Sequence, residues 1–201
     1  ITITVSSKMS GTYQAFEAAA NKYRNETTQI AVIDSKQNSA AQGLIVMRAA
    51  EMVDAGLSFK DVVNRLHKII EQSTILVSVK TLKYMVRSGR VSKVTGLIAK
   101  LLNLKPVISI DKDGNGIILE KALSIKKNTQ IIIDTFMKNY KEKGIERYSI
   151  IHANDKKRAK ELEEKIMSLT NTEASYITDI SPIVAMSAGV GAIAIAYITK
   201  E

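Results

Sequence analysis

The chain contains no cysteine, no tryptophan and only two histidines among its 201 residues. Without cysteine it can form neither disulfides nor thiolate metal sites, and it has no thiol nucleophile. His67 and His152 alone are too few for a histidine-rich metal site. We therefore expect neither a bound metal nor a cofactor.

Aromatic residues are also scarce, at 5% of the chain, which leaves little material for stacking the bases of a single strand. The net charge is nevertheless +9, a balance that suits nucleic acid, an anionic membrane surface or an acidic ligand. The basic residues alternate with acidic ones, as in residues 155–165 (DKKRAKELEEK), which is typical of a solvated helix face. We expect no nucleic-acid partner, and we keep an acidic ligand and a transient membrane-surface contact as candidates.

Long apolar runs are missing as well. Residues 180–198 carry no charge over 19 residues but contain Pro182, two serines and two glycines. This length is marginal for a transmembrane helix, so we predict two buried strands joined by a loop. No signal or transit sequence is visible, and a cytoplasmic location is expected. Because Ile1 already lies within a strand pattern, we expect the natural protein to begin further upstream.

The periodicity of apolar residues predicts an α/β protein. The first part alternates strands and helices in the order β-α-β-α-α, which indicates a parallel sheet covered by helices. The predicted elements there are strands 1–5 and 30–33, helices 12–24 and 38–55, and a helix capped by Ser58. The later elements are strand 74–79, helical pieces within 81–102, a hairpin over 107–120, helices 125–141 and 155–168, and strands 148–152 and 174–178. We predict two domains: a truncated three-layer parallel-sheet domain over 1–73 and an α+β domain over 74–201.

A hydroxyl-rich turn, residues 6–14 (SSKMSGTYQ), separates the first strand from the first helix. Hydroxyls beside free N–H groups at the positive end of a helix can bind a carboxylate or a phosphate. The alternative is that Ser10 merely caps the helix while Gly11 permits the turn. The turn lacks the Gly-x-x-x-x-Gly-Lys pattern of a nucleotide-binding loop.

Two further motifs imitate known sites without completing them. Residues 111–116 (DKDGNG) copy the start of a calcium-binding EF-hand loop, but Ala122 stands where a bidentate glutamate is needed, so we predict a hairpin turn. Residues 189–194 (GVGAIA) imitate a dinucleotide fingerprint, but the β-branched Ile193 and Ile195 favour a closing strand after a glycine turn. No carboxylate pair or nucleophile–base pair emerges, so we expect a binding protein and not an enzyme.

Taken in order, these segments resemble the DegV family of bacterial fatty-acid-binding proteins. Residues 6–13 (SSKMSGTY) are similar to the family's Ser-Ser-x-Leu-Ser-Gly-Thr-Tyr turn. Residues 82–92 (LKYMVRSGRVS) are similar to its Leu-x-x-Leu-x-x-Gly-Gly-Arg-Ile-Ser segment. Residues 32–36 (VIDSK) with Gln42 and Gly43, and residues 105–108 (KPVI), follow at the family's spacing.

The resemblance implies a DegV-like fold of two α/β domains with a long-chain fatty acid in an apolar tunnel between them. It implies that Ser10, in one turn with Gly11 and Thr12, holds the carboxylate. A threonine upstream of Ile1 and a C-terminal histidine would assist, and Ser187 stands at the histidine's position.

The resemblance also implies a partner. Some family members are binding subunits of fatty acid kinase and present the acid to a separate catalytic subunit. Arg90 is the expected partner contact here, and Leu123 stands where the family has an arginine implicated in kinase engagement. We expect helices 38–55 and 93–102 and the closing strands to line the tunnel.

Two other readings stay open. The chain could be a regulatory or interaction protein that keeps the fold without kinase coupling. It could also be an enzyme that binds a phosphorylated substrate at the Ser10 turn, provided that an upstream segment supplies a base or a metal ligand.

Overall fold

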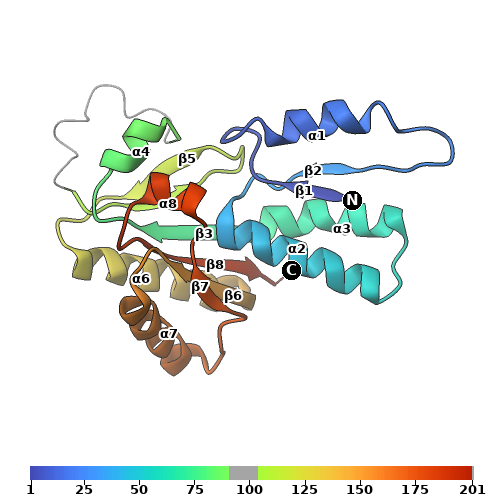
Figure 1. Cartoon of the computed structure of the whole chain (residues 1–201). Coiled ribbons are helices and arrows are strands. Elements are labelled where there is room, and N and C mark those ends of the chain that lie inside the picture. Colours follow the sequence, from blue (N-terminus) through green and yellow to red (C-terminus); the bar gives the residue numbers. More distant parts are fainter. Residues whose placement is uncertain (91–103, 201) are drawn as a thin grey trace.

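The computed structural model describes residues 1–90 and 104–200, which form two sheets covered by helices (Figure 1). The small sheet consists of two parallel strands, β1 (Thr2–Thr4) and β2 (Val32–Asp34), with α1 (Thr12–Ala20) packed against them. The large sheet has the strand order β5-β4-β3-β8-β6-β7. Adjacent strands pair antiparallel, except that β6 and β7 pair parallel. Its strands are β3 (Ser73–Ser78), β4 (Val107–Ile110), β5 (Gly116–Glu120), β6 (Ile145–His152), β7 (Ile177–Asp179) and β8 (Ile193–Thr199).

Helices cover both faces of the large sheet. One face packs against α2 (Ser39–Asp54) and α3 (Phe59–Gln72), and the other packs against α6 (Ile125–Lys143) and α7 (Lys156–Thr170). Two short helices, α4 (Lys83–Ser88) and α8 (Pro182–Ala188), pack against each other near the ends of β3 and β8 (Figure 1).

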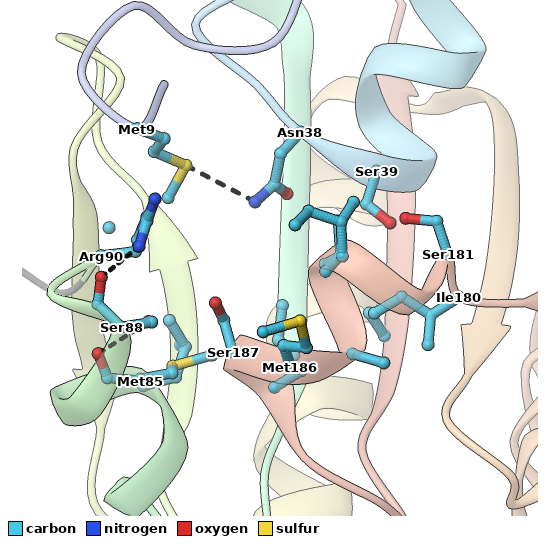
Figure 2. A pocket seen from close by; sticks show the side chains of 18 of the residues that line it. Met9, Asn38, Ser39, Met85, Ser88, Arg90, Ile180, Ser181, Met186 and Ser187 are labelled. Atoms are coloured by element: carbon cyan, nitrogen blue, oxygen red, sulfur yellow. Dashed lines mark hydrogen bonds between the residues drawn. The ribbon is translucent and has the colours of Figure 1, made fainter. Parts of the chain in front are cut away.

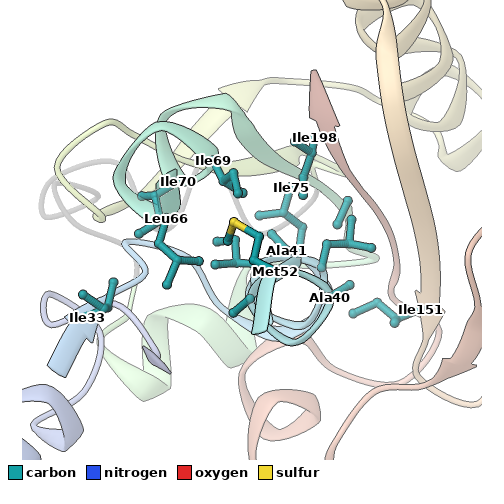
Figure 3. Close-up of a cluster of buried hydrophobic side chains, with 14 of the residues drawn as sticks. Ile33, Ala40, Ala41, Met52, Leu66, Ile69, Ile70, Ile75, Ile151 and Ile198 are labelled. Carbon is teal, nitrogen blue, oxygen red and sulfur yellow. The ribbon is translucent and has the colours of Figure 1, made fainter. Parts of the chain in front are cut away.

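The central strand β8 contributes side chains to both hydrophobic cores, one on each face of the large sheet. All seven of its residues are buried, because helices cover it on both sides. Successive side chains point to opposite faces, so Ile193, Ile195 and Tyr197 join the α6–α7 core while Ala194, Ala196 and Ile198 join the α2–α3 core. Figure 3 shows Ile198 in the α2–α3 core together with Ile75 of β3. The small alanines leave room for α2, whose buried face is itself rich in alanine.

A cluster of charges joins α2 to β6. Glu51 accepts hydrogen bonds from Arg147 at 2.6 Å and from Arg48 at 2.7 Å, and Arg48 lies 2.9 Å from Glu146. These bonds hold the pKa of Glu51 below its ordinary value, with the bond from Arg147 the largest cause.

Most of the predicted elements are confirmed, including the parallel pairing of the first two strands and the hairpin. Ser58 caps α3, since its hydroxyl accepts a hydrogen bond from the Asp61 N–H at 3.2 Å. The predicted division into a domain over 1–73 and a domain over 74–201 stays a prediction. Helices α2 and α3, which belong to the first of these ranges, pack against the large sheet, whose strands belong almost entirely to the second. The expected helix 93–102 lies outside the described residues.

The prediction of two strands over residues 180–198 is wrong in its first half, which forms α8. Ser181 is the N-cap residue and Pro182 occupies the first turn, where its missing N–H costs nothing. The helix ends at Gly189, whose φ of +81° is a conformation that glycine adopts freely. Among the described helices, none is both long and apolar enough to span a membrane.

Candidate functional site

A cavity of about 1240 Å³ lies between the β1–α1 turn, the start of α2, the β3–β4 face of the large sheet, and helices α4 and α8. This volume exceeds the range of roughly 300–1,000 Å³ that is usual for small-molecule pockets. Figure 2 shows that side chains from these segments, distant in the sequence, converge on one space.

The floor of the cavity is apolar. It is formed by side chains of β3, β4, β6 and β8, namely Ile75, Val77, Ile108, Ile151 and Ala194. Ile75, Ile151 and Ala194 are buried and also belong to the core beneath α2 and α3. Ser39 and Gln42 at the start of α2 line the same cavity. The floor therefore offers dispersion contacts to a ligand and few hydrogen-bond partners.

The wall formed by α8 is apolar and open to solvent. Ile183, Met186 and Val190 all line the cavity, yet they are 72%, 71% and 67% exposed. Large apolar side chains that are exposed at a cavity can contact an apolar ligand.

Hydroxyl groups supply the polar part of the lining. Ser10 and Thr12 line the cavity, and their side-chain oxygens lie 2.7 Å apart, so one donates to the other. The Ser10 hydroxyl also accepts from the Thr12 N–H at 3.3 Å. Gly11 is the N-cap residue of α1, and no side chain caps the helix, so the alternative prediction that Ser10 caps it is wrong. The anion site at this turn stays a prediction.

Ser187 and Arg90 also line the cavity. Ser187 belongs to α8, and Figure 2 shows it between Met186 and the segment that carries Ser88 and Arg90. Arg90 is exposed and donates a hydrogen bond to the Ser88 carbonyl at 2.5 Å. The structure thus gathers Ser10, Thr12, Ser187 and Arg90 around one space.

The turn after α8 is tied to the large sheet. The Gly191 N–H donates to the Ala153 carbonyl at 2.7 Å, and the Gly191 carbonyl accepts from Arg158 at 2.9 Å. Arg158 also donates to the hydroxyl of Ser78 at the end of β3. Burial lowers the pKa of Arg158, although Asp155 opposes the shift. These bonds fix the C-terminal side of the α8 wall.

The sequence predicts a strand where α8 lies, because Pro182, the two serines and the two glycines make residues 180–198 a poor long helix. The Ser-Pro pair at 181–182 was the available signal, since serine favours the N-cap and proline the first helical position. His152, one of the two histidines of the chain, is buried, and its Nδ1 atom lies 3.0 Å from the Asp179 Oδ1 atom. In the part of the chain that the structure describes, no group of three or more acidic or histidine side chains could hold a metal.

The fold and the cavity define a mixed α/β protein with a large, open, mainly apolar binding space. A family model described as "uncharacterised protein, DegV family" matches residues 1–200. The chain belongs to the DegV family.

Individual relatives agree with this assignment. A DegV domain-containing protein of Clostridium perfringens is 31% identical, with all of this chain and 70% of that protein covered. The fatty acid kinase B3 protein of Streptococcus pneumoniae, solved with linoleic acid, is 27% identical with a TM-score of 0.86, over 98% of this chain and 70% of that one. A DegV family protein of Ruminococcus gnavus, refined with vaccenic acid, is 26% identical with a TM-score of 0.84, over 96% of this chain and 70% of that one.

Proposed function

We propose that this protein binds a long-chain fatty acid in the cavity and carries it without transforming it. The observation that supports this most strongly is the exposed apolar wall of α8, because an acyl chain between α8 and the sheet would cover Ile183 and Met186. The relatives solved with linoleic and vaccenic acid support the same ligand class.

The carboxylate is proposed to bind at the hydroxyl groups of the lining. Ser10 and Thr12 share one turn with Gly11, and Ser187 faces the same cavity from α8. A hydrogen bond to a charged group contributes roughly 1.5–3 kcal/mol, whereas each buried methylene contributes about 0.8 kcal/mol. Burial of the chain therefore supplies most of the affinity, and the hydroxyls select the acid head group.

A comparison of hexadecanoic acid with its methyl ester tests this proposal. Both ligands bury the same chain, but only the acid carries a negative charge. In a fluorescent-probe displacement titration we expect the acid to compete at least about tenfold better than the ester, as one charge-assisted bond predicts. If neither ligand displaces the probe, the proposal is wrong.

We also propose that Arg90, exposed at the edge of the cavity, contacts a partner acyl kinase that receives the carboxylate. In a reconstituted assay with the kinase subunit of the same organism, Arg90→Ala should retain fatty acid binding and lose acyl phosphate formation. Full acyl phosphate formation by the variant would exclude this role.

A second candidate is an interaction protein that binds the acid without kinase coupling. Leu123, which stands where the resemblance expects an arginine, is 84% exposed and offers no charge to a kinase. The same reconstituted assay separates the two candidates, since the wild type would then form no acyl phosphate.

A further inference from the structure

The β4–β5 hairpin turn, residues 111–116, extends from the large sheet to the turn that carries Ser10 (Figure 1). Ser6 is completely buried at this contact, and its hydroxyl donates to the Gly114 carbonyl at 2.7 Å. A Cβ atom on Gly114 would lie 2.4 Å from the Ser6 hydroxyl oxygen, closer than atoms can approach. The hairpin and the hydroxyl-rich turn are therefore in direct contact.

Ser6 in turn determines where Ser10 lies. The Ser6 carbonyl accepts hydrogen bonds from the Met9 N–H at 3.0 Å and from the Ser10 N–H at 3.1 Å. The Ser6 hydroxyl also accepts from the Lys8 N–H at 3.2 Å. A shift of Ser6 would consequently move the three N–H groups that shape the turn and displace the Ser10 hydroxyl.

The hairpin turn is stiff enough to hold this position. The Asp111 carboxylate accepts hydrogen bonds from the backbone N–H groups of Asp113 at 3.0 Å and Asn115 at 2.9 Å. These bonds, with that from the Asn115 N–H the largest cause, hold the pKa of Asp111 below its ordinary value. The turn is therefore held in shape by hydrogen bonds among its own residues.

The same turn also contacts the segment that carries Arg90. A Cβ atom on Gly116 would lie 2.5 Å from the Arg90 carbonyl oxygen and 3.1 Å from the Met9 side chain. One rigid turn thus touches both the segment around Ser10 and the segment around Arg90.

We propose that the 111–116 hairpin turn is a positioning element for the head-group site, acting through the contact of Gly114 with Ser6. This inference rests on the proposed function, since it concerns binding of the carboxylate. Ser6 and Gly114 need not touch the ligand; they fix the place of Ser10.

Two variants of the full chain test this role. Ser6→Ala removes the hydroxyl that bonds Gly114, and Gly114→Ala pushes the hairpin away from Ser6. We expect affinity for hexadecanoic acid to fall about threefold to tenfold in Ser6→Ala, as for one lost hydrogen bond, and roughly tenfold to a hundredfold in Gly114→Ala, as for a lost charge-assisted bond. Affinity for the methyl ester should change little, which a general loss of structure would not produce.

Gly56→Ala is the matched control. Gly56 has a φ of +77°, close to the +92° of Gly114, but a Cβ atom there would meet nothing within 4 Å. Gly56→Ala therefore introduces similar backbone strain without a steric clash. The Gly56→Ala variant should bind acid and ester as the wild type does. Equal losses for acid and ester in Gly114→Ala, or none, would overturn the inference.

Hydrogen exchange of the unliganded protein separates this inference from the proposed function. The Met9 and Ser10 N–H groups should exchange faster in Gly114→Ala than in Gly56→Ala, whether or not any acid binds. If exchange is faster but the wild type binds no acid, the proposed function is wrong while the contact holds the turn. If exchange is unchanged, the positioning role is wrong.

Discussion

Under the proposed function, single side chains select the head group of the ligand. The Ser10 hydroxyl is engaged only by its neighbour Thr12 in the described part of the chain, so it can turn toward a ligand without breaking a distant contact. Arg90 adds positive charge at the same cavity. The lining thus offers neutral donors close by and a cation at its edge, which suits a carboxylate.

The first prediction concerns Ser10→Ala. Loss of a hydrogen bond to a charged group costs roughly 1.5–3 kcal/mol, so the affinity for hexadecanoic acid should fall about 10- to 150-fold. The melting temperature should hardly change, because Gly11, not Ser10, is the N-cap residue of α1. A displacement titration measures the affinity. Unchanged binding would mean that Ser10 serves only the local turn.

The second prediction concerns Ser187→His. Serine does not titrate near neutrality, so acid binding by the wild type should be nearly independent of pH between about 6 and 8. A histidine at this position, with an ordinary pKa near 6.5, gains positive charge as the pH falls and attracts the carboxylate. The variant should therefore bind the acid more tightly at the lower pH, and the methyl ester equally at both. A flat profile for the variant would place residue 187 away from the head group.

The residue types of this site could be predicted from the sequence, but their arrangement could not. The hydroxyl-rich turn and the family resemblance singled out Ser10, Gly11, Thr12 and Ser187; Ser10, Thr12 and Ser187 line the cavity, whereas Gly11 does not. The dependence of Ser10 on the hairpin was not predictable, because Ser6 and Gly114 are 108 positions apart and carry no local signal of contact.

Helices and strands determine the shape of the cavity. Apolar periodicity made α3 predictable, and the content of alanine, methionine and leucine made α2 predictable, since both helices bury apolar residues against the sheet. The short α8 was not predicted, because seven residues give too little periodicity and both of its faces are apolar. The apolar face of α8 that is not buried in the core lines the cavity.

The third prediction concerns the ion pair that joins α2 to β6. Because the pKa of Glu51 is lowered in the folded protein, its carboxylate stabilises the fold above its ordinary pKa of 4.5, and this contribution disappears as the pH falls through the lowered value. Glu51→Gln should lower the melting temperature at pH 7, and the difference from the wild type should shrink as the pH falls below 4.5. Since Glu51 is 44% exposed, the effect should stay below about 1 kcal/mol.

Calorimetry across this pH range measures the effect. Glu71→Gln on the exposed face of α3 provides the control, and it should differ little from the wild type at any pH. A Glu51→Gln deficit that persists unchanged at pH 3 would show that packing, and not the charge, joins the two elements.

The molecule as a whole is a scaffold that places α8 opposite the large sheet. Its α/β class followed from the order of elements, but the position of β8 between β3 and β6 did not. Pairing between strands more than 100 residues apart depends on the whole core and leaves no local pattern. The net charge of +9 favours the approach of an anionic ligand.

Chain-length selection tests the central claim, that this cavity buries an acyl chain. The purified protein is stripped of ligand, incubated with an equimolar mixture of octanoic, dodecanoic and hexadecanoic acids, and measured by native mass spectrometry. Because each buried methylene contributes about 0.8 kcal/mol, we expect a one-to-one adduct dominated by hexadecanoic acid. No adduct, or equal adducts of all three acids, would contradict the account.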